Sequence, residues 1–517
     1  MPKWFDDAVF YEIYPSSFQD SNGDGYGDLQ GIISRLDYIK DLGFNAIWLN
    51  PIFRSPFMDG GYDVSDFFDI DPRFGTMQDA EELLKQAHQK GIRIILDLVA
   101  GHASEQHPLF LKSAEPTRNE YSDLFVWNHS PWDKPQGWWQ FISGRHDRHA
   151  NYMVNFFSCQ PAFNYGWKEI KYPEWQMHYK DPRCLKTREY LKSIIRFWLE
   201  KGFDGFRVDM ADSLVKGDDD KSATIELWQE IRQEIFDKEY PEAVLVSEWS
   251  DHEKSLRAGF HGDFYLDHYG NGYNRLFRYI QHDVNLSYFN GNGDISAFLA
   301  DYMPRYQAAN HYGGHVCFIS GNHDSYRLGS NGYTERMLRL MYAFLLTMPG
   351  VPFIYNGDEI GMAHMEGLPS KEGGYQRTGS RTPMQWDSTK NMGFSLAEED
   401  QLYLPLNKTK PVNVEEQSKR SDSLLNTIRD LISIRKKYDD LRSRDFHVLF
   451  AEPYAYPFVY ERGQFVVAIN PSANERRICG NYEYLEQMYA IGEVEVKEQL
   501  LCMEPWSFAI YRKGGKK

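Results

Sequence analysis

The sequence contains no uninterrupted apolar segment of the roughly 18 residues that mark a candidate membrane-spanning helix. It is also short of basic residues: 57 Lys and Arg stand against 74 Asp and Glu, giving a formal net charge of −17. Because binding to a phosphate backbone needs a basic surface, this balance argues against nucleic acid as a partner. Both deficits favour a soluble protein without a membrane or nucleic-acid partner.

Cysteine is scarce as well. The five cysteines are an odd number, widely spaced and without a CxxC pair: Cys159, Cys184, Cys317, Cys479 and Cys502. This pattern is typical of buried thiols in a reducing compartment. The segment 1–14, MPKWFDDAVFYEIY, has no apolar run behind a basic start and therefore predicts no signal peptide. We expect a cytoplasmic monomer.

Aromatic residues, in contrast, are abundant, with 34 Tyr and 13 Trp in 517 residues. Most of these rings must belong to a large core, which a chain of this length can bury. The segment 127–141, WNHSPWDKPQGWWQF, is both aromatic and polar. Such segments suit ligands with flat apolar faces and polar edges, and sugars fit that description.

Short apolar runs recur along the chain, each followed by a helical pattern. The runs lie at 8–18, 46–53, 92–102, 202–210, 243–250, 261–269, 315–324 and 351–362. Between them stand helical segments such as 76–91, which opens with the capping-box pair Thr76 and Asp79. Alternating strands and helices imply parallel strands with right-handed crossovers. Eight such units predict an α/β protein with a closed (β/α)₈ TIM barrel.

Two segments do not fit the barrel pattern. About eighty residues rich in Pro, Trp and His separate the third strand from its helix, which is too long for a simple loop. From about residue 440, short alternating strands surround turn residues, as in an antiparallel β-domain. The expected organisation is a barrel formed by 1–102 and 181–437, a B-domain inserted at 103–180, and a C-terminal β-sandwich at 438–517.

Charged side chains gather where the predicted strands end. Catalytic groups of a parallel barrel lie at those ends, and here they are Asp97, His102, Arg207, Asp209, Glu248, His323 and Asp324. A single such residue would be explained by capping, an ion pair or a satisfied core histidine. Three or more carboxylates at one end are hard to explain by stability, because like charges repel at short range.

Two of these carboxylates form a plausible acid–base pair. Arg207 and Asp209 are two residues apart on a strand and share a face. The guanidinium should lower the pKa of Asp209 and keep it ionised, as a nucleophile requires. Glu248 has apolar and aromatic neighbours in VLVSEWS, which should raise its pKa and let it deliver a proton. One ionised and one protonated carboxyl are the pair used in glycoside hydrolysis.

Five motifs then resemble those of the α-amylase family of glycoside hydrolases, in the same order and over nearly the whole chain. They are GYDVSDF (61–67), DLVAGH (97–102), GFRVDM (205–210), SEWS (247–250) and GNHD (321–324). QPAFN (160–164) and RTPMQWD (381–387) are similar to the branch that contains α-glucosidases and oligo-1,6-glucosidases. The family architecture is a (β/α)₈ barrel with a B-domain in the third loop and a C-terminal β-domain.

The resemblance assigns a role to each polar residue. Asp209 would be the nucleophile, Glu248 the acid/base and Asp324 the stabiliser of the transition state. The residues expected around the terminal glucose are Tyr62, Asp63, His102, Arg207, His323 and Arg381.

The stretch 20–28, DSNGDGYGD, looks like a calcium-sensor loop. However, its twelfth position is Gly31 rather than Glu, and it joins an apolar strand to a helical pattern at 29–42, which excludes an EF-hand. The loop resembles the metal loop of the same branch, in which one structural Ca²⁺ would bind Asp20, Asn22, Asp24, Asp28 and the carbonyl of Tyr26. The alternative is a cation-free Asx-turn loop, and the choice between Ca²⁺ and Mg²⁺ stays open.

Three functions compete. The first is a retaining, exo-acting α-glucosidase on short oligosaccharides or disaccharides, because the insert and the long segment 361–419 should wall the barrel mouth into a blind pocket. The second is a transferase or isomerase of the same branch that makes trehalose-like or other disaccharides. The third is a non-catalytic relative, which the presence of all three acids disfavours. Met210 matches neither the Val of α-1,6-specific relatives nor the Ala or Thr of α-1,4-specific ones, so the linkage stays open.

Overall fold

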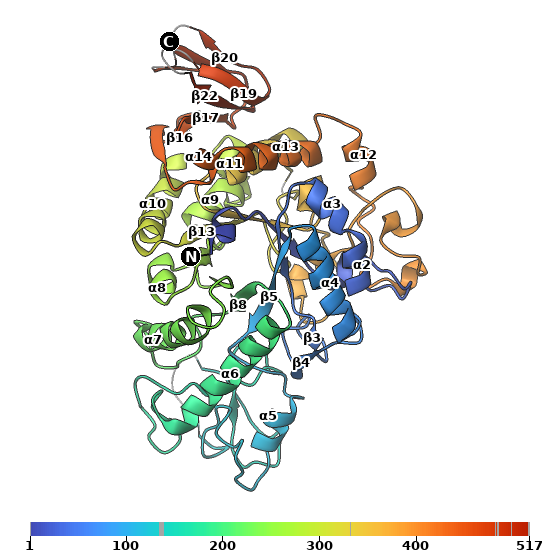
Figure 1. Ribbon diagram of the computed structural model, residues 1–517, viewed down its shortest axis with the longest axis vertical. Helices are drawn as coiled ribbons and strands as arrows, with labels where there is room; N and C mark the ends of the chain where they lie inside the picture. Colours follow the sequence, from blue (N-terminus) through green and yellow to red (C-terminus); the bar gives the residue numbers. More distant parts are fainter. Residues whose placement is uncertain are drawn as a thin grey trace.

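The computed structural model describes residues 2–133, 139–330, 332–480, 482, 485–497 and 499–514. At its centre is a closed barrel with strand order β1-β14-β13-β10-β9-β8-β5-β2, in which all neighbours are parallel (Figure 1). The strands are β1 (Phe10–Ile13), β2 (Ala46–Leu49), β5 (Arg93–Val99), β8 (Gly205–Asp209), β9 (Val244–Ser247), β10 (Gly262–Phe264), β13 (His315–Ile319) and β14 (Val351–Tyr355). Each lies within one of the eight predicted runs, so the (β/α)₈ prediction is confirmed.

Helices connect successive strands and cover the outside of the barrel (Figure 1). The main ones are α4 (Met77–Gln89), α6 (Pro182–Glu200), α7 (Ser222–Ile231), α8 (His252–Arg257), α10 (Ile295–Tyr312), α11 (Glu335–Thr347) and α13 (Leu424–Lys437). The predicted capping box of α4 is present, since Thr76 and Asp79 exchange hydrogen bonds. It fixes the start of this helix.

The helix expected at 29–42 is instead two short helices, α2 (Leu29–Ser34) and α3 (Leu36–Asp41). They meet at Arg35, whose φ of −109° and ψ of 5° are not helical. The guanidinium of Arg35 donates to Gln19 Oε1 at 2.8 Å and lies 4.0 Å from the ring centre of Trp386. These contacts with distant segments override the local helical pattern.

The barrel interior is filled by side chains that the sequence presents as continuous apolar runs. Phe10 and Phe353 stack at 4.2 Å between neighbouring strands, and Trp48 and Phe264 pack beside them. Strands buried on both faces read as continuous runs. The polar residues at the carboxyl ends of these strands therefore face a mouth whose floor is a dry, close-packed core.

The insert after β5 is a small unit of its own. It holds α5 (Pro108–Ser113) and the hairpin β6 (Phe141–Ile142) and β7 (Tyr152–Met153), and it lies at the opposite end of the molecule from the C-terminal sheets (Figure 1). Its aromatic segment 127–141 is divided: Trp127 is buried and Trp132 is exposed. Residues 134–138 of that segment lie outside the described residues.

The C-terminal part is built from two antiparallel sheets. One has the order β15-β16-β17-β22-β19 and the other β18-β21-β20. Their bounds are β15 (His447–Phe450), β16 (Phe458–Arg462), β17 (Phe465–Asn470), β18 (Arg476–Cys479), β19 (Leu485–Ile491), β20 (Val494–Lys497), β21 (Leu500–Met503) and β22 (Ser507–Lys513). Val466 and Ala509 from the first sheet share an apolar cluster with Leu501 and Met503 from the second. Such a core between sheets is the defining feature of a sandwich.

The structure bears on two expectations, one about membrane-spanning helices and one about the cysteines. Within the described ranges, no helix has both the length and the apolar character needed to cross a membrane. All five cysteines are free, and Cys159, Cys184 and Cys317 are buried as expected. Cys479 is exposed and Cys502 is half-buried, so the expectation of buried thiols is wrong for these two. Both lie on strands of the small three-stranded sheet.

Candidate active site

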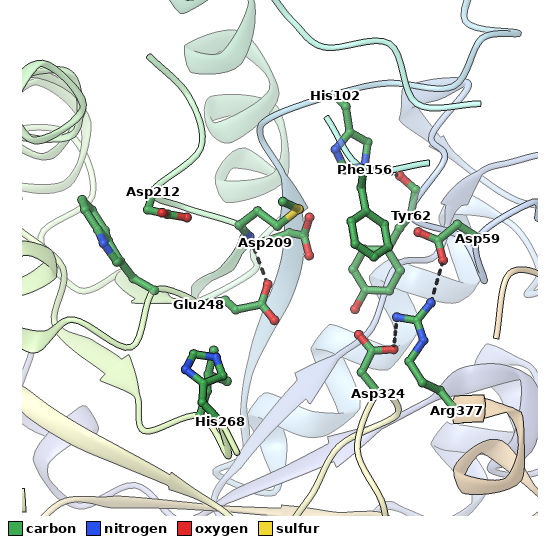
Figure 2. Close-up of a pocket in the computed structure, with 13 residues that line it drawn as sticks. Asp59, Tyr62, His102, Phe156, Asp209, Asp212, Glu248, His268, Asp324 and Arg377 are labelled. Atoms are coloured by element: carbon green, nitrogen blue, oxygen red, sulfur yellow. Dashed lines mark hydrogen bonds and ion pairs between the residues drawn. The ribbon is translucent and has the colours of Figure 1, made fainter. Parts of the chain in front are cut away.

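A cavity of about 360 Å³ opens at the carboxyl ends of the barrel strands. Its lining combines acids, aromatic rings and two histidines: Asp59, Tyr62, His102, Phe156, Asp209, Met210, Asp212, Glu248, Trp249, Leu266, His268, Asp324 and Arg377. Asp209, Glu248 and Asp324 face one another across it (Figure 2). The three acids singled out in the sequence therefore share one pocket.

Arg207 lies beneath the pocket and pairs with three carboxylates. Its Nη1 is 2.7 Å from Asp97 Oδ1 and 3.1 Å from Asp209 Oδ1, while its Nη2 is 2.8 Å from Glu248 Oε1. Arg207 is 1% exposed, so these ion pairs are screened little by solvent. One guanidinium thus holds carboxylates from β5, β8 and the end of β9 in fixed positions.

The pKa shift expected for Asp209 is not found in the free protein. Burial and the negative charge of Glu248 raise the pKa of Asp209 well above its usual value, although Arg207 opposes this. The prediction of a lowered pKa for Asp209 is therefore wrong, because burial and the charge of Glu248 outweigh Arg207, which also pairs with Asp97 and Glu248. The dry surroundings expected for Glu248 are also not found, since its Oε2 accepts the Met210 N–H at 3.0 Å and its Oε1 pairs with Arg207.

Asp324 is held by two arginines from the segment after β14. Its Oδ1 accepts hydrogen bonds of 2.8 Å from both Arg377 Nη1 and Arg381 Nη2. Burial alone would raise the pKa of Asp324, but these neighbouring charges outweigh it and hold the pKa below its usual value. Arg381 itself lies behind the pocket, where its Nε donates to the His323 carbonyl at 3.0 Å. Asp324 is therefore ionised over the whole physiological range.

His102 and His323 are both neutral. Burial lowers the pKa of His102 and of His323 to about 3. His102 Nε2 lies 3.2 Å from the Tyr62 carbonyl, and His323 Nδ1 lies 2.9 Å from Glu12 Oε1. His102 lines the cavity, whereas His323 stacks under the ring of Tyr62 at 5.3 Å.

Tyr62 and Asp63 are neighbours in the sequence, but only the Tyr62 side chain lines the cavity. Tyr62 lines the cavity, and its hydroxyl donates to Asp97 Oδ2 at 2.9 Å. The carboxylate of Asp63 instead accepts the N–H groups of Met58 (2.9 Å) and Asp59 (3.0 Å), so it stabilises the turn that precedes it. Asp63 is not among the residues that line the cavity, whereas Asp59 is.

From the sequence, the insert and the segment 361–419 were expected to wall the pocket, but the residues that do so were not identified. Arg377 lies between Asp324 and Asp59, with its Nη2 3.5 Å from Asp59 Oδ1 (Figure 2). Phe156 of the insert stands beside it, and the neighbouring Phe157 ring meets Tyr375 at 5.6 Å. The insert and the segment after β14 therefore meet over the mouth. The sequence offered one signal for Arg377, which is its position in GGYQRTGSR, four residues before Arg381.

The opposite side of the pocket is lined by Met210, which sequence reasoning connected with linkage preference, and by residues that it did not single out. These are Asp212 after β8, Trp249 after β9, and Leu266 and His268 after β10. Met210 has a φ of 40°, which non-glycine residues rarely adopt and which often marks a functional turn. This side is half apolar and half polar, as a second sugar ring would need.

Hydrogen bonds within the loop 20–28 largely fix its conformation. Asp20 accepts the N–H groups of Asn22 (3.0 Å), Gly23 (2.7 Å) and Gly25 (2.8 Å), together with the Ser395 hydroxyl (2.5 Å). Asp28 caps α2 through the Gly31 N–H. In the described part of the chain, no cluster of three His, Cys, Asp or Glu side chains is placed to hold a metal. The expected ligands are nevertheless all oxygens, which suit a hard cation.

A closed (β/α)₈ barrel whose pocket at the carboxyl ends of the strands holds Asp209, Glu248 and Asp324 has the architecture and the acid pair of glycoside hydrolases of the TIM-barrel class. The family model for the α-amylase catalytic domain matches residues 12–444. The chain therefore belongs to the α-amylase family, in the branch with α-glucosidases.

Relatives in this family carry several activities. The chain is 29% identical to the oligo-1,6-glucosidase of Parageobacillus thermoglucosidasius, covering 98% of this chain and 99% of that protein. It is 32% identical to the trehalose synthase/amylase TreS of Mycolicibacterium smegmatis, covering 84% and 77%. The crystal structure of the trehalulose synthase MutB from Pseudomonas mesoacidophila MX-45 is similar with a TM-score of 0.81 at 26% identity, covering 99% and 100%.

Proposed function

We propose that this protein is a retaining, exo-acting α-glucosidase that removes the non-reducing terminal glucose of short α-1,4- or α-1,6-linked oligosaccharides. The observation that carries the proposal is the pocket that holds Asp209, Glu248 and Asp324. Arg377 and Phe156 wall it on one side, which favours entry of a chain end over passage of a long chain. A cavity of about 360 Å³ is also at the small end of the range for ligand sites.

In the proposed reaction, the Asp209 carboxylate attacks the anomeric carbon while Glu248 gives its proton to the departing glycosidic oxygen. A covalent glucosyl–Asp209 ester forms, and the released sugar leaves. Glu248 then takes a proton from water, and the resulting hydroxyl attacks the same carbon from the other side and frees Asp209. Two inversions give net retention.

The decisive experiment follows the first product by NMR from a short malto- or isomalto-oligosaccharide. α-Glucose should appear first, and polymeric starch should be a poor substrate. Initial release of β-glucose would refute the double displacement. Rapid thinning of starch with long fragments would refute entry by the chain end and indicate an endo-acting enzyme.

The second candidate is a glucosyltransferase or isomerase that forms trehalose or isomerises sucrose. The similarity to TreS and to MutB favours it, because those proteins are named for such products. Both functions use the same glucosyl–enzyme ester and differ in whether water or a sugar hydroxyl intercepts it. The product profile on maltose and on sucrose separates them: glucose as the main product supports hydrolysis, and a new disaccharide supports the alternative.

We also propose one structural Ca²⁺ in the loop 20–28. The all-oxygen composition of Asp20, Asn22, Asp24, Asp28 and the Tyr26 carbonyl supports it. The four hydrogen bonds to Asp20 support the cation-free alternative. Chelation should lower Tm and leave the low-temperature rate nearly intact, since the cation would bind only the folded state. A Tm that responds neither to chelator nor to added Ca²⁺ would support the cation-free loop.

A further inference from the structure

A buried carboxyl that the proposed reaction does not use lies beneath the pocket. Glu12 on β1 is fully buried, and its Oε1 is 2.9 Å from Nδ1 of His323. Among the described residues, its other oxygen, Oε2, has no hydrogen-bond partner. A carboxylate with both oxygens buried normally collects several donors, so this arrangement calls for an explanation.

The short contact between Glu12 and His323 contains one proton, which can sit on either side. An ionised Glu12 would accept Nδ1–H, and a protonated Glu12 would donate to a bare Nδ1. The Asn50 amide indicates on which side the proton lies, because its Nδ2 is 3.2 Å from Nδ1 of His323. The same Nδ2 is 3.5 Å from Asp97 Oδ2, which opposes turning the amide round. An NH₂ group that faces Nδ1 favours a nitrogen without hydrogen there.

The other ring nitrogen of His323 leads to the same answer. Nε2 lies 3.4 Å from Asp324 Oδ2, and Asp324 is ionised beside Arg377 and Arg381. A lone pair on Nε2 would face that negative charge, whereas an N–H would face it favourably. The ring is neutral, so it carries a single N–H. Placing it on Nε2 leaves Nδ1 bare, and the proton of the short contact then belongs to Glu12.

The charges around Glu12 agree with this assignment. Arg207 favours the charged form of Glu12, but Asp97, Asp209 and Glu248 already engage that guanidinium. Burial is the largest influence and raises the pKa of Glu12 well above its usual value; Arg207 and the Asn50 amide lower it in part, and the charge of Asp97 raises it again. The hydroxyl of Tyr355, which also borders Glu12, is itself neutral because burial raises its pKa.

Asp97 on β5 provides the contrast. It is equally buried, but it accepts hydrogen bonds from Arg207 Nη1 (2.7 Å), the Tyr62 hydroxyl (2.9 Å) and Trp48 Nε1 (3.0 Å). A carboxylate with three such donors is stabilised in its charged form. Two buried carboxyls near the same site thus differ in donor supply, because Asp97 accepts from three donors, two of them on one oxygen, whereas Oε2 of Glu12 has no hydrogen-bond partner among the described residues.

We propose that Glu12 is a positioning residue that carries a proton at neutral pH, donates it to Nδ1 of His323, and thereby holds His323 as an Nε2–H donor facing Asp324 and the sugar hydroxyls. The part of this proposal that concerns the sugar rests on the proposed function. The part that concerns the proton does not, because it follows from contacts in the free protein. Second-layer partners of this kind fix the tautomer and orientation of a histidine.

The first test reads the proton without any substrate. In protein labelled with ¹⁵N-histidine, Nδ1 of His323 should give an unprotonated and Nε2 a protonated nitrogen signal at pH 7. A carboxylic-acid C=O band should be present in the infrared spectrum and lost in Glu12→Gln. A protonated Nδ1, or no lost acid band, would overturn the proposal. Because no turnover is needed, this result stands apart from the fate of the α-glucosidase proposal.

The second test compares variants. Glu12→Leu removes the donor and should lower kcat/KM about 10- to 100-fold, as loss of a supporting partner does elsewhere. Glu12→Gln supplies a neutral NH₂ donor and should recover most of that loss, with the pH–rate profile of the wild type. Asp97→Asn, the matched control, removes a charge and should shift that profile. A shift of about one unit in Glu12→Gln would show that Glu12 is ionised in the wild type.

Discussion

The floor and the outer wall of the pocket are held in different ways. The floor is made by side chains at the ends of barrel strands, and Asp97, Arg207 and His323 are each at most 1% exposed. The wall is made by Phe156 from the insert and Arg377 from the segment after β14, and Phe156 is 50% exposed. The floor is buried and charged, whereas in the wall two chain segments meet through side chains such as Phe157 and Tyr375.

We expect the floor to carry out the reaction and the wall to determine which substrate is accepted. Removing the single cation of a buried ion-pair network costs about 3–5 kcal/mol in typical cases, because the remaining carboxylates stay buried without a counter-charge. Exposed contacts are worth much less. Substitutions in the floor should therefore abolish the reaction, and substitutions in the wall should change which substrate is accepted.

The largest effect is expected for Asp209→Asn, which keeps the shape of the floor and removes the attacking charge. Activity should fall by roughly 10³-fold or more, because the covalent step cannot proceed without its nucleophile. Tm should be unchanged or raised, since Asp209 and Glu248 no longer repel each other. Kinetics with an aryl α-glucoside and a thermal melt measure both effects.

Asp212→Asn is the matched control for this substitution. Asp212 also lines the pocket, three residues further along, but it pairs with Lys221 at 3.1 Å and its side chain is 37% exposed. It should keep most of the activity. Near-normal turnover in Asp209→Asn, or an equal loss in both variants, would show that Asp209 is not the nucleophile.

The second prediction concerns pH. The pKa of Asp209 in the folded protein is raised, so the charged form destabilises the fold at pH values above that pKa. The thermal advantage of Asp209→Asn over the wild type should therefore be largest at neutral pH and vanish as the pH falls. The acidic limb of kcat/KM should lie above the ordinary range of an aspartate. An advantage that grows on acidification would contradict the raised pKa.

The sequence predicted the floor far better than the wall, for a physical reason. Parallel strands end at one mouth, so the position of Asp209, Glu248 and Asp324 follows from strand order alone. Contacts between the insert and the segment after β14 depend on how two long irregular segments pack. Phe156 and Arg377 have 220 residues between them in the chain, and no periodicity connects them.

Within the floor, sequence reasoning failed where several groups share one partner. Arg207 was expected to lower the pKa of Asp209, but it also binds Asp97 and Glu248, and burial together with the charge of Glu248 outweighs it. The family resemblance placed Asp63 near the sugar, whereas its carboxylate accepts N–H groups of the turn at 57–62. Spacing indicates which residues converge but not how they divide their hydrogen bonds.

A smaller effect is expected for Arg377→Gln, which opens the wall. The change removes the cation between Asp324 and Asp59, and burial and the charge of Asp324 already raise the pKa of Asp59 to about 6. KM for a disaccharide should rise by about 10-fold or more, as expected when roughly 1.4 kcal/mol of binding is lost. Lys390→Gln, on the same segment but paired with Glu398 at the surface, should be neutral. An unchanged KM in Arg377→Gln would mean that the wall does not contact the sugar.

The smallest effect is expected for Phe156→Ala at the exposed edge of the wall. An aromatic ring that stacks on a ligand contributes about 0.5–1.5 kcal/mol, which corresponds to roughly 2- to 10-fold in KM. Tm should not change, because the ring is half exposed and belongs to no core. Trp132→Ala is the control, since Trp132 lies on the same insert, is 87% exposed and is not among the lining residues. A fall in kcat with KM unchanged would place Phe156 in the chemistry of the floor rather than in the selection of the substrate.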